Sequence, residues 1–198
     1  ARRGCLVLFT NYFPYFRGEE YLEAELPFLL ERFERIVIVP VMFENGMERS
    51  RELPADVGVV PVHMPSAWRA RVAHLVKNGA SAGASGLLRE AARPWQPLRF
   101  LLDLYFTTRS LEFWRRARVA VLDAVDDCDD VVIYSYWLFV TAFEAVLLRR
   151  ELGPRARLAV SRAHRYDVVK EANRLRFLPQ RRLLVSGLDA VQIGRAHV

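Results

Sequence analysis

The groups best suited to chemistry lie in a polar run that directly follows an apolar strand. The stretch from Arg157 to Val168, RLAVSRAHRYDV, begins with Leu158-Ala159-Val160 and then becomes strongly polar. The polar positions are Ser161, Arg162, His164, Arg165, Tyr166 and Asp167. Open α/β sheets bind ligands outside the carboxyl ends of their strands, and an imidazole there can act near neutral pH. The alternative is a solvated loop in which His164 and Asp167 pair only with each other.

A series of apolar strands and amphipathic helices is expected to position this run. Strands are predicted at Cys5–Thr10, Ile36–Pro40, Val57–Val62, Val131–Tyr136, Leu158–Val160 and Ala190–Ile193. Helices are predicted at about 19–32, 97–125 and 138–150, with a short helical stretch at 169–175. Continuous apolar runs indicate strands that are buried on both faces, as in parallel sheets. The predicted fold class is therefore α/β, a Rossmann-like parallel sheet with helices on both faces.

The segment 66–126 differs from the rest and is interpreted as a helical insertion within one domain, 1–193. It contains a basic amphipathic helix from Trp68 to Lys77 and a flexible surface loop, GASAGASG, from Gly79 to Gly86. The acidic run from Asp126 to Asp130 is interpreted as a solvated connector. Its spacing is unlike that of a calcium loop, so no metal site is predicted there.

Composition limits the class of protein. The 198 residues are 52% hydrophobic and 26% charged, as in folded chains. The net charge of +6, mostly from arginine, fits phosphate-bearing partners or an anionic membrane face, and equally a high-GC genome. Cys5 and Cys128 are not expected to form a disulfide framework, which fits a reducing cytosol. No apolar run approaches the roughly 20 residues that span a bilayer, so a cytoplasmic protein is expected.

The two ends suggest a fragment. The chain begins ARRG without Met, and Ile193 to Val198 match the in-frame translation of a common sequencing adapter. Residues 194–198 are therefore interpreted as an artefact and left out of the fold prediction.

Three segments together resemble the N-terminal half of a GT-B glycosyltransferase of the family 4 type, bacterial enzymes of polysaccharide and glycolipid assembly. The segments are Phe9–Pro14 with Gly18–Glu25, then Tyr134–Trp137, then Ser161–Asp167. They are similar to the family's first strand, glycine loop and helix start, to a strand end beside the acceptor cleft, and to the segment that supplies an acceptor-site histidine. The similarity covers most of residues 4–193 and is weakest from Ser66 to Ala92.

The resemblance implies the acceptor-side domain of a two-domain enzyme. The expected reaction transfers a sugar from a nucleotide-sugar donor to a saccharide or lipid-linked acceptor, with retention and without a metal or other cofactor. The donor would bind mainly to a C-terminal domain that this chain lacks, so the chain alone is expected to be inactive. Because many enzymes of this class act on lipid-linked acceptors, the resemblance also implies peripheral membrane contact at the inner face, with the Trp68–Lys77 helix as the candidate surface. The alternative, slightly favoured for this helix, is a solvated basic face packed on the sheet.

The resemblance assigns roles to single residues. His164 is the expected catalytic group, which would orient or polarise the acceptor hydroxyl. Asp167 would fix the imidazole tautomer or bind acceptor hydroxyls. The expected substrate-binding residues are Arg17, Gly18, Tyr136, Trp137, Arg162, Arg165 and Asp167. Where the family often has Gly-Gly in the first loop, this chain has Arg17-Gly18. Glu19 and Glu25 are interpreted as charges at a helix N-terminus rather than as catalysts.

Each of these assignments has an alternative. Gly18 can mark a plain helix start, the two arginines can simply solvate the loop, and Tyr134, Tyr136 and Trp137 can form a buried aromatic seam. For the whole chain, one alternative is a non-enzymatic module that binds phosphate or nucleic acid, although no nucleic-acid motif is recognisable. Another is a GT-B-like nucleotide-sugar epimerase.

Overall fold

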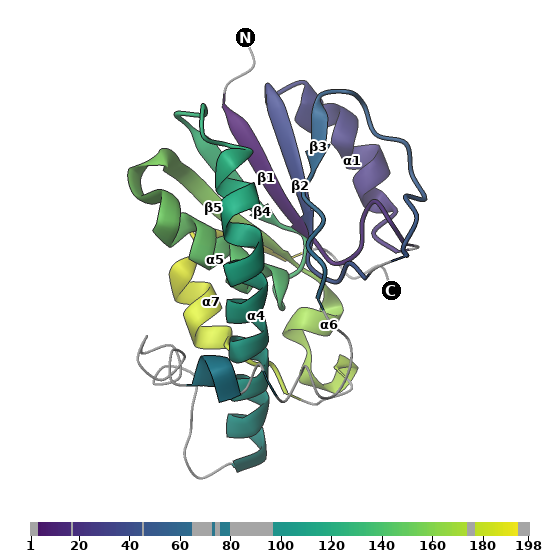
Figure 1. The fold of residues 1–198 in the computed structure, drawn as a ribbon. Coiled ribbons are helices and arrows are strands. Elements are labelled where there is room, and N and C mark those ends of the chain that lie inside the picture. Colours follow the sequence, from purple (N-terminus) through teal and green to yellow (C-terminus); the bar gives the residue numbers. More distant parts are fainter. Residues whose placement is uncertain are drawn as a thin grey trace.

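The protein is an α/β fold built on one parallel sheet. A computed structural model describes residues 4–16, 18–44, 46–64, 73, 76–79, 97–173 and 177–193. Within these residues six strands form a single, all-parallel sheet in the order β3-β2-β1-β4-β5-β6 (Figure 1). The strands are β1 (Cys5–Thr10), β2 (Arg35–Pro40), β3 (Val57–Val59), β4 (Val131–Ser135), β5 (Ala156–Ala163) and β6 (Ala190–Ile193). This Rossmann-like order confirms the predicted fold class and places a topological switch point between β1 and β4.

Helices cover both faces of the sheet. Helix α1 (Tyr21–Leu30) packs on one face, where Leu22 and Leu26 join a core cluster with Leu6 and Ile36. Three helices on the other face, α4 (Pro97–Asp123), α5 (Thr141–Leu152) and α7 (Arg181–Gly187), share the second and larger core cluster (Figure 1). The short elements η1 (Gly153–Arg155), α6 (Arg165–Val168) and η2 (Lys170–Ala172) complete the connections on either side of β5.

The central strand β1 has apolar side chains on both of its faces, so helices can pack on both sides of the sheet. All six of its residues are buried; Leu6 and Leu8 face the α1 layer, while Val7 and Phe9 face the α4–α5 layer. Each such apolar side chain contributes about 1.5–3 kcal/mol on full burial. Gly4 precedes the strand at φ +68°, and a Cβ there would lie 2.4 Å from the carbonyl oxygen of Asp130. Only glycine fits this entry to the strand.

Some predicted bounds differ from the structure. Strand β5 extends into the predicted polar run and ends at Ala163, whereas β3 ends at Val59 rather than Val62. Helix α7 was not predicted, and in the stretch predicted as helical from residue 169 to 175 the described residues 169–173 contain the short η2. Most of the Trp68–Lys77 helix, residues 80–86 of the glycine-rich loop and residues 194–198 lie outside the described residues.

Candidate functional site

The candidate site lies where β1, β4 and β5 end beside the switch point. Ser135, the last residue of β4, pairs with Phe9 of β1 on one side and Ser161 of β5 on the other. Tyr136 and Trp137 follow β4 directly, and His164 follows β5. Polar and aromatic side chains that are far apart in the sequence therefore meet at the carboxyl ends of these strands.

Three hydroxyl groups fix the backbone at Trp137. Its carbonyl oxygen accepts hydrogen bonds from Oγ of Ser135 at 2.6 Å, Oγ1 of Thr141 at 2.9 Å and Oγ of Ser161 at 3.1 Å. All three donors are buried side chains with no exposed surface. The turn between β4 and α5 is therefore held from β4, β5 and the start of α5 together.

His164 lies against two aromatic rings. Its imidazole centroid is 4.2 Å from that of Trp137 and 5.0 Å from that of Tyr136. Its Nε2 lies 3.0 Å from the carbonyl oxygen of Tyr136. Because a carbonyl can only accept, Nε2 carries the proton in this contact. Tyr136 is buried, whereas Trp137 and His164 are partly exposed, so these two rings form the accessible part of the cluster.

The Asp167 carboxylate holds the backbone near the imidazole of His164. One carboxylate oxygen, Oδ2, accepts from the backbone N–H of His164 at 3.0 Å and of Leu138 at 3.3 Å. The first contact belongs to a capping box at the start of α6. Burial raises the pKa of Asp167, against these N–H groups and nearby charges, which lower it. The side chain is 3% exposed, so its contacts are internal.

The largest departure from the sequence interpretation is Glu19, which is buried at the centre of the site. Its carboxylate accepts from the backbone N–H groups of Asn11 at 2.8 Å, Tyr12 at 2.9 Å and Phe13 at 2.8 Å. It also accepts from the indole Nε1 of Trp137 at 2.8 Å. Glu19 lies just before α1, as expected of a charge at a helix N-terminus, but at 8% exposure its burial was not expected from the sequence. Its position between Gly18 and α1, beside the end of β1, was the one sequence feature that could have indicated a place in the site.

The first loop uses its backbone donors internally. Three successive amides after β1 bind the Glu19 carboxylate, and the N–H of Gly18 donates to Glu20 at 3.3 Å. Gly18 adopts φ +106°, a conformation that favours glycine. Arg17 lies outside the described residues. A phosphate role for Gly18 therefore stays a prediction, and it would have to use donors other than the amides of Asn11, Tyr12 and Phe13.

Arg162 is tied to α1 by an ion pair. Its guanidinium bonds both carboxylate oxygens of Glu25, at 3.0 Å and 2.9 Å. It also lies 5.2 Å from the ring centroid of Tyr136 and 5.8 Å from that of Tyr134, whose hydroxyl donates to Glu25 at 3.3 Å. Such bidentate, stacked arginines are firmly held. Glu25 is thus a second carboxylate whose role the sequence did not reveal.

The predicted residues divide into three groups. Tyr136, Trp137, His164 and Asp167 come together at the strand ends. Arg162 joins them through Tyr136 but is occupied by Glu25, and Gly18 adjoins them through Glu19. Arg165 is exposed in the first turn of α6.

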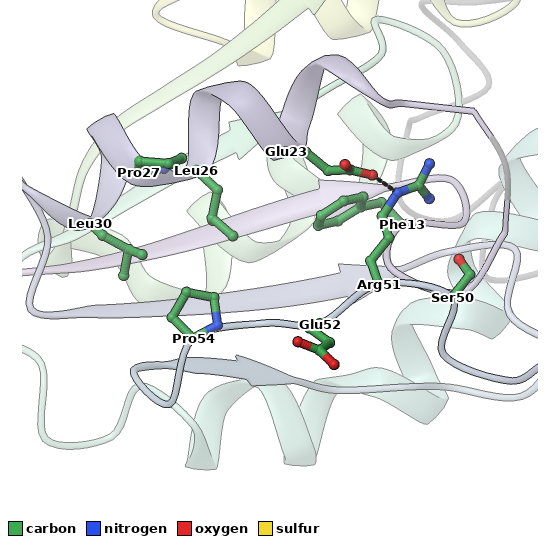
Figure 2. A pocket seen from close by; sticks show the side chains of 9 residues that line it. All are labelled: Phe13, Glu23, Leu26, Pro27, Leu30, Ser50, Arg51, Glu52 and Pro54. Carbon is green, nitrogen blue, oxygen red and sulfur yellow. Dashed lines mark hydrogen bonds and ion pairs between the residues drawn. The ribbon is translucent and has the colours of Figure 1, made fainter.

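A separate pocket of about 800 Å³ lies between α1 and the segment that precedes β3 (Figure 2). Its apolar floor is formed by Phe13, Leu26, Pro27, Leu30 and Pro54. Across the floor Arg51 makes an ion pair with Glu23, donates to the carbonyl of Phe16 at 2.6 Å and covers the Phe13 ring (Figure 2). The volume suits a small ligand. Through Phe13 the pocket adjoins the loop that holds Glu19.

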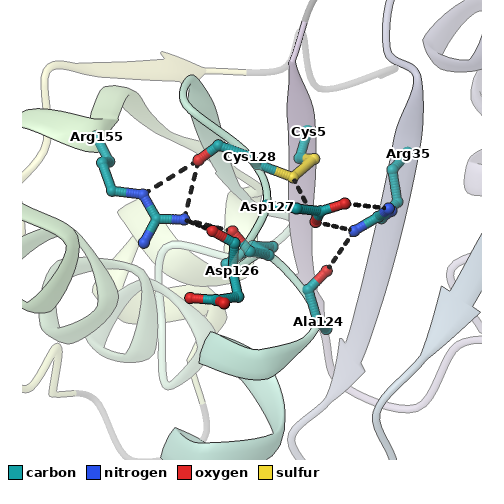
Figure 3. The surroundings of a disulfide bond; sticks show 8 residues. Cys5, Arg35, Ala124, Asp126, Asp127, Cys128 and Arg155 are labelled. Carbon is teal, nitrogen blue, oxygen red and sulfur yellow. Dashed lines mark hydrogen bonds and ion pairs between the residues drawn. A yellow bond between two sulfur atoms is a disulfide. The ribbon is translucent and has the colours of Figure 1, made fainter.

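At the amino end of β1, opposite the candidate site, a disulfide joins Cys5 to Cys128 (Figure 3). This corrects the expectation that Cys5 and Cys128 do not form a disulfide framework. The strand-like run of Cys5 and the acidic turn of Cys128 are 123 residues apart in sequence, yet their Cα atoms lie 6.1 Å apart. The sheet brings them together because β4 starts beside β1, a consequence of topology that the local sequence does not show.

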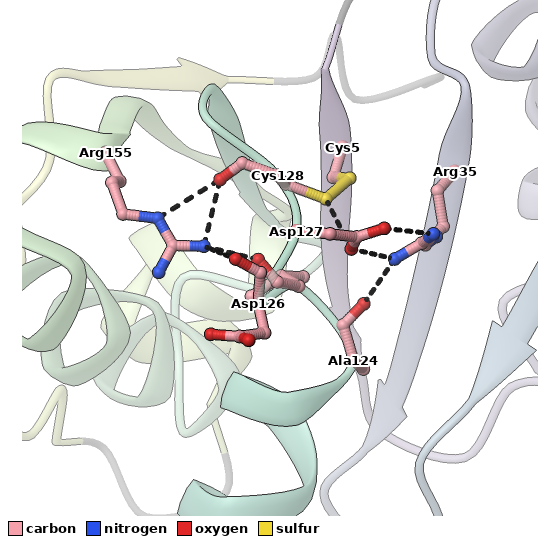
Figure 4. Close-up of polar contacts among 8 residues, drawn as sticks. Cys5, Arg35, Ala124, Asp126, Asp127, Cys128 and Arg155 are labelled. Atoms are coloured by element: carbon pink, nitrogen blue, oxygen red, sulfur yellow. Dashed lines mark hydrogen bonds and ion pairs between the residues drawn. A yellow bond between two sulfur atoms is a disulfide. The ribbon is translucent and has the colours of Figure 1, made fainter.

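The acidic turn is a firmly anchored connector. Arg155 donates to the carbonyl oxygens of Val125, Asp126 and Cys128, and Arg35 donates to the Asp127 carboxylate at 2.9 Å (Figure 4). Pairing with Arg35 lowers the pKa of Asp127. Across the described ranges, no three His, Cys, Asp or Glu side chains gather in a way that could hold a metal ion.

Comparison with known proteins gives no family assignment, so a function has to be argued from the residues of the site. No protein-family model matches the chain, and no curated protein matches it. Within the described residues, no helix combines the length and apolar character that crossing a membrane requires.

Proposed function

We propose that this chain is the acceptor-side domain of a glycosyltransferase of GT-B architecture, with His164 at the acceptor hydroxyl. The observation that carries the proposal is the imidazole packed against the Trp137 ring at the carboxyl ends of β1, β4 and β5. A partly exposed indole is a suitable platform for a sugar ring, and the neighbouring imidazole can bind a hydroxyl group. The ordered similarity of three sequence segments to family 4 enzymes supports the same conclusion.

In the proposed reaction the bond between the sugar C1 and the donor diphosphate oxygen breaks, and a new bond forms from C1 to the acceptor oxygen. The acceptor hydroxyl gives its proton to the departing diphosphate oxygen, and the nucleoside diphosphate leaves with the bonding electron pair. His164 would orient that hydroxyl, while the Asp167 carboxylate keeps the His164 backbone in place. The donor would be held by a second domain, and retention of configuration is proposed for the family as a whole.

The test is His164→Ala in the protein that carries both domains. Transfer from a nucleotide sugar should fall by about 10²-fold or more if the imidazole acts on the reacting hydroxyl. Thermal unfolding of the same variant should change little, because the His164 side chain is only partly buried. The matched control is Tyr166→Ala, which removes an exposed ring from the same short helix.

Two outcomes would contradict the proposal. Unchanged kinetics in His164→Ala would remove this residue from the reaction. Sugar transfer by the 198-residue chain alone would show that donor chemistry does not need a second domain. A protein that releases a free, isomerised sugar nucleotide product without transfer would instead favour the epimerase alternative.

A further inference from the structure

We propose that Glu19 is a positioning residue for the acceptor platform, a role that rests on the proposed function. Its carboxylate fixes the indole of Trp137, and the indole ring, packed against the imidazole, in turn fixes the position of His164. The connection is direct at each step: 2.8 Å from Glu19 Oε1 to Trp137 Nε1, then 4.2 Å between the ring centroids of Trp137 and His164.

The geometry fits an internal anion better than a substrate-binding carboxylate. A carboxylate has about four sites that accept hydrogen bonds, and four N–H groups bind Glu19. Three of the donors are backbone amides of one loop, and the fourth belongs to the partly exposed ring of the site. With its acceptor sites used and its surface buried, Glu19 acts on a ligand only through what it holds.

The backbone of Glu19 supports the same interpretation. It adopts φ +60°, in the left-handed region that few non-glycine residues occupy. Such a conformation persists where surrounding contacts stabilise it, and the four bonds to its carboxylate supply that stabilisation. Gly18 immediately before it provides the other unusual backbone angle.

The Trp137 backbone does not depend on Glu19. Its carbonyl oxygen is held by the hydroxyls of Ser135, Thr141 and Ser161, all on the sheet or on α5. Loss of the Glu19 carboxylate should therefore release the indole ring while the turn that carries it stays in place. This separation allows a positioning role to be measured apart from folding.

The experiment uses nuclear magnetic resonance on the 198-residue chain. The indole N–H of Trp137 is assigned with Trp137→Phe, and the imidazole C–H signals of His164 are assigned with His164→Ala. In Glu19→Ala the indole signal should move toward that of a solvent-exposed indole. The His164 signals should lose the displacement caused by the Trp137 ring current.

Two further variants complete the comparison. Glu19→Gln keeps one carbonyl oxygen but sets an NH2 group against the backbone donors, so its shifts should be intermediate. Glu31→Gln makes the same chemical change at an exposed position at the end of α1 and should leave both signals in place. An unmoved indole signal in Glu19→Ala, or an indole that moves while His164 does not, overturns the proposal.

Kinetics in the two-domain protein separate this proposal from the proposed function. Glu19→Ala should raise KM for the acceptor about ten-fold and leave KM for the nucleotide sugar unchanged. Glu19→Gln should restore part of the loss. Wild-type protein without transferase activity would contradict the proposed function, while the spectroscopic result would still decide whether Glu19 positions the two rings. An unchanged acceptor KM in an active enzyme would contradict the positioning role.

Discussion

Asp103 is a buried carboxyl group whose protonation should affect stability near neutral pH. It is 1% exposed on α4, and Oδ1 accepts from the backbone N–H of Gln180 at 3.0 Å. Burial raises its pKa from 3.8 to about 6, and the bond from Gln180 offsets only part of that rise. The folded protein therefore holds this proton more tightly than the unfolded chain does. The contribution of protonated Asp103 to the free energy of unfolding is complete below about pH 4 and is lost as the pH rises through about 6.

Asp103→Asn should remove this pH dependence, because an amide keeps the acceptor oxygen and does not ionise. The free energy of unfolding of the variant, relative to wild type, should increase by on the order of 2 kcal/mol between pH 4 and pH 7.5. Urea unfolding of both proteins across that range measures the difference. A constant difference at all pH values would show that Asp103 titrates alike in the folded and unfolded chains.

At the scale of single residues, the sequence could indicate only those site positions that depend on the order of strands in the sheet. His164 and Trp137 could be placed together because each follows an apolar strand in a parallel sheet. Glu19 could not be placed, since its role depends on three amides of an irregular loop converging on one carboxylate. The hold of Asp167 on the backbone also depends on local geometry, because the sequence suggested only that it lies near His164.

At the scale of elements, the apolar runs in the sequence predicted where the strands lie, but polar residues at strand ends made the bounds of some strands hard to predict. β1 and β6 have the predicted bounds. β5 continues through Ser161 and Arg162 because Ser161 bonds the Trp137 carbonyl and Arg162 bonds Glu25, so neither polar side chain needs water. Helix α7 has only seven residues, and such a segment shows too little periodicity to be recognised.

The disulfide between β1 and the turn after α4 should contribute to stability by limiting the unfolded chain. It closes a loop with a sequence separation of 123 residues. Replacing both Cys5 and Cys128 with Ala should lower the free energy of unfolding by about 2–4 kcal/mol. Thermal unfolding in the absence of reductant measures the loss.

Reductant provides the control for this prediction. Dithiothreitol should destabilise the wild-type protein and leave the double variant unchanged. Alkylation of both thiols in the native protein without reductant, detected by mass spectrometry, would contradict a disulfide in solution. The Arg155 bonds to the same turn should keep it in place when the disulfide is reduced.

At the scale of the whole molecule, several arginines in the described part of the chain are paired with carboxylates from other elements. These pairs are Arg35–Asp127, Arg51–Glu23, Arg118–Glu151, Arg149–Asp189 and Arg162–Glu25. Paired guanidinium groups are poorly available to external phosphates.

The chain should therefore show little binding to duplex DNA. A face that neutralised several phosphates would give a logarithmic salt dependence of about −0.9 per phosphate. We expect a slope near zero in fluorescence anisotropy between about 50 and 200 mM salt. Tight binding that weakens steeply with salt would instead favour the phosphate- or nucleic-acid-binding alternative.

The hydrogen bond from Trp137 to Glu19 connects the segments that lead into the helix layers on the two faces of the sheet. Glu19 leads into α1 on one face of the sheet, and Trp137 leads into α5 on the other. A ligand bound to the indole ring of Trp137 would therefore stabilise the helix layers on both faces of the sheet. Deuterium uptake should then slow in the opening turns of both helices, although the two share no direct backbone hydrogen bond among the described residues.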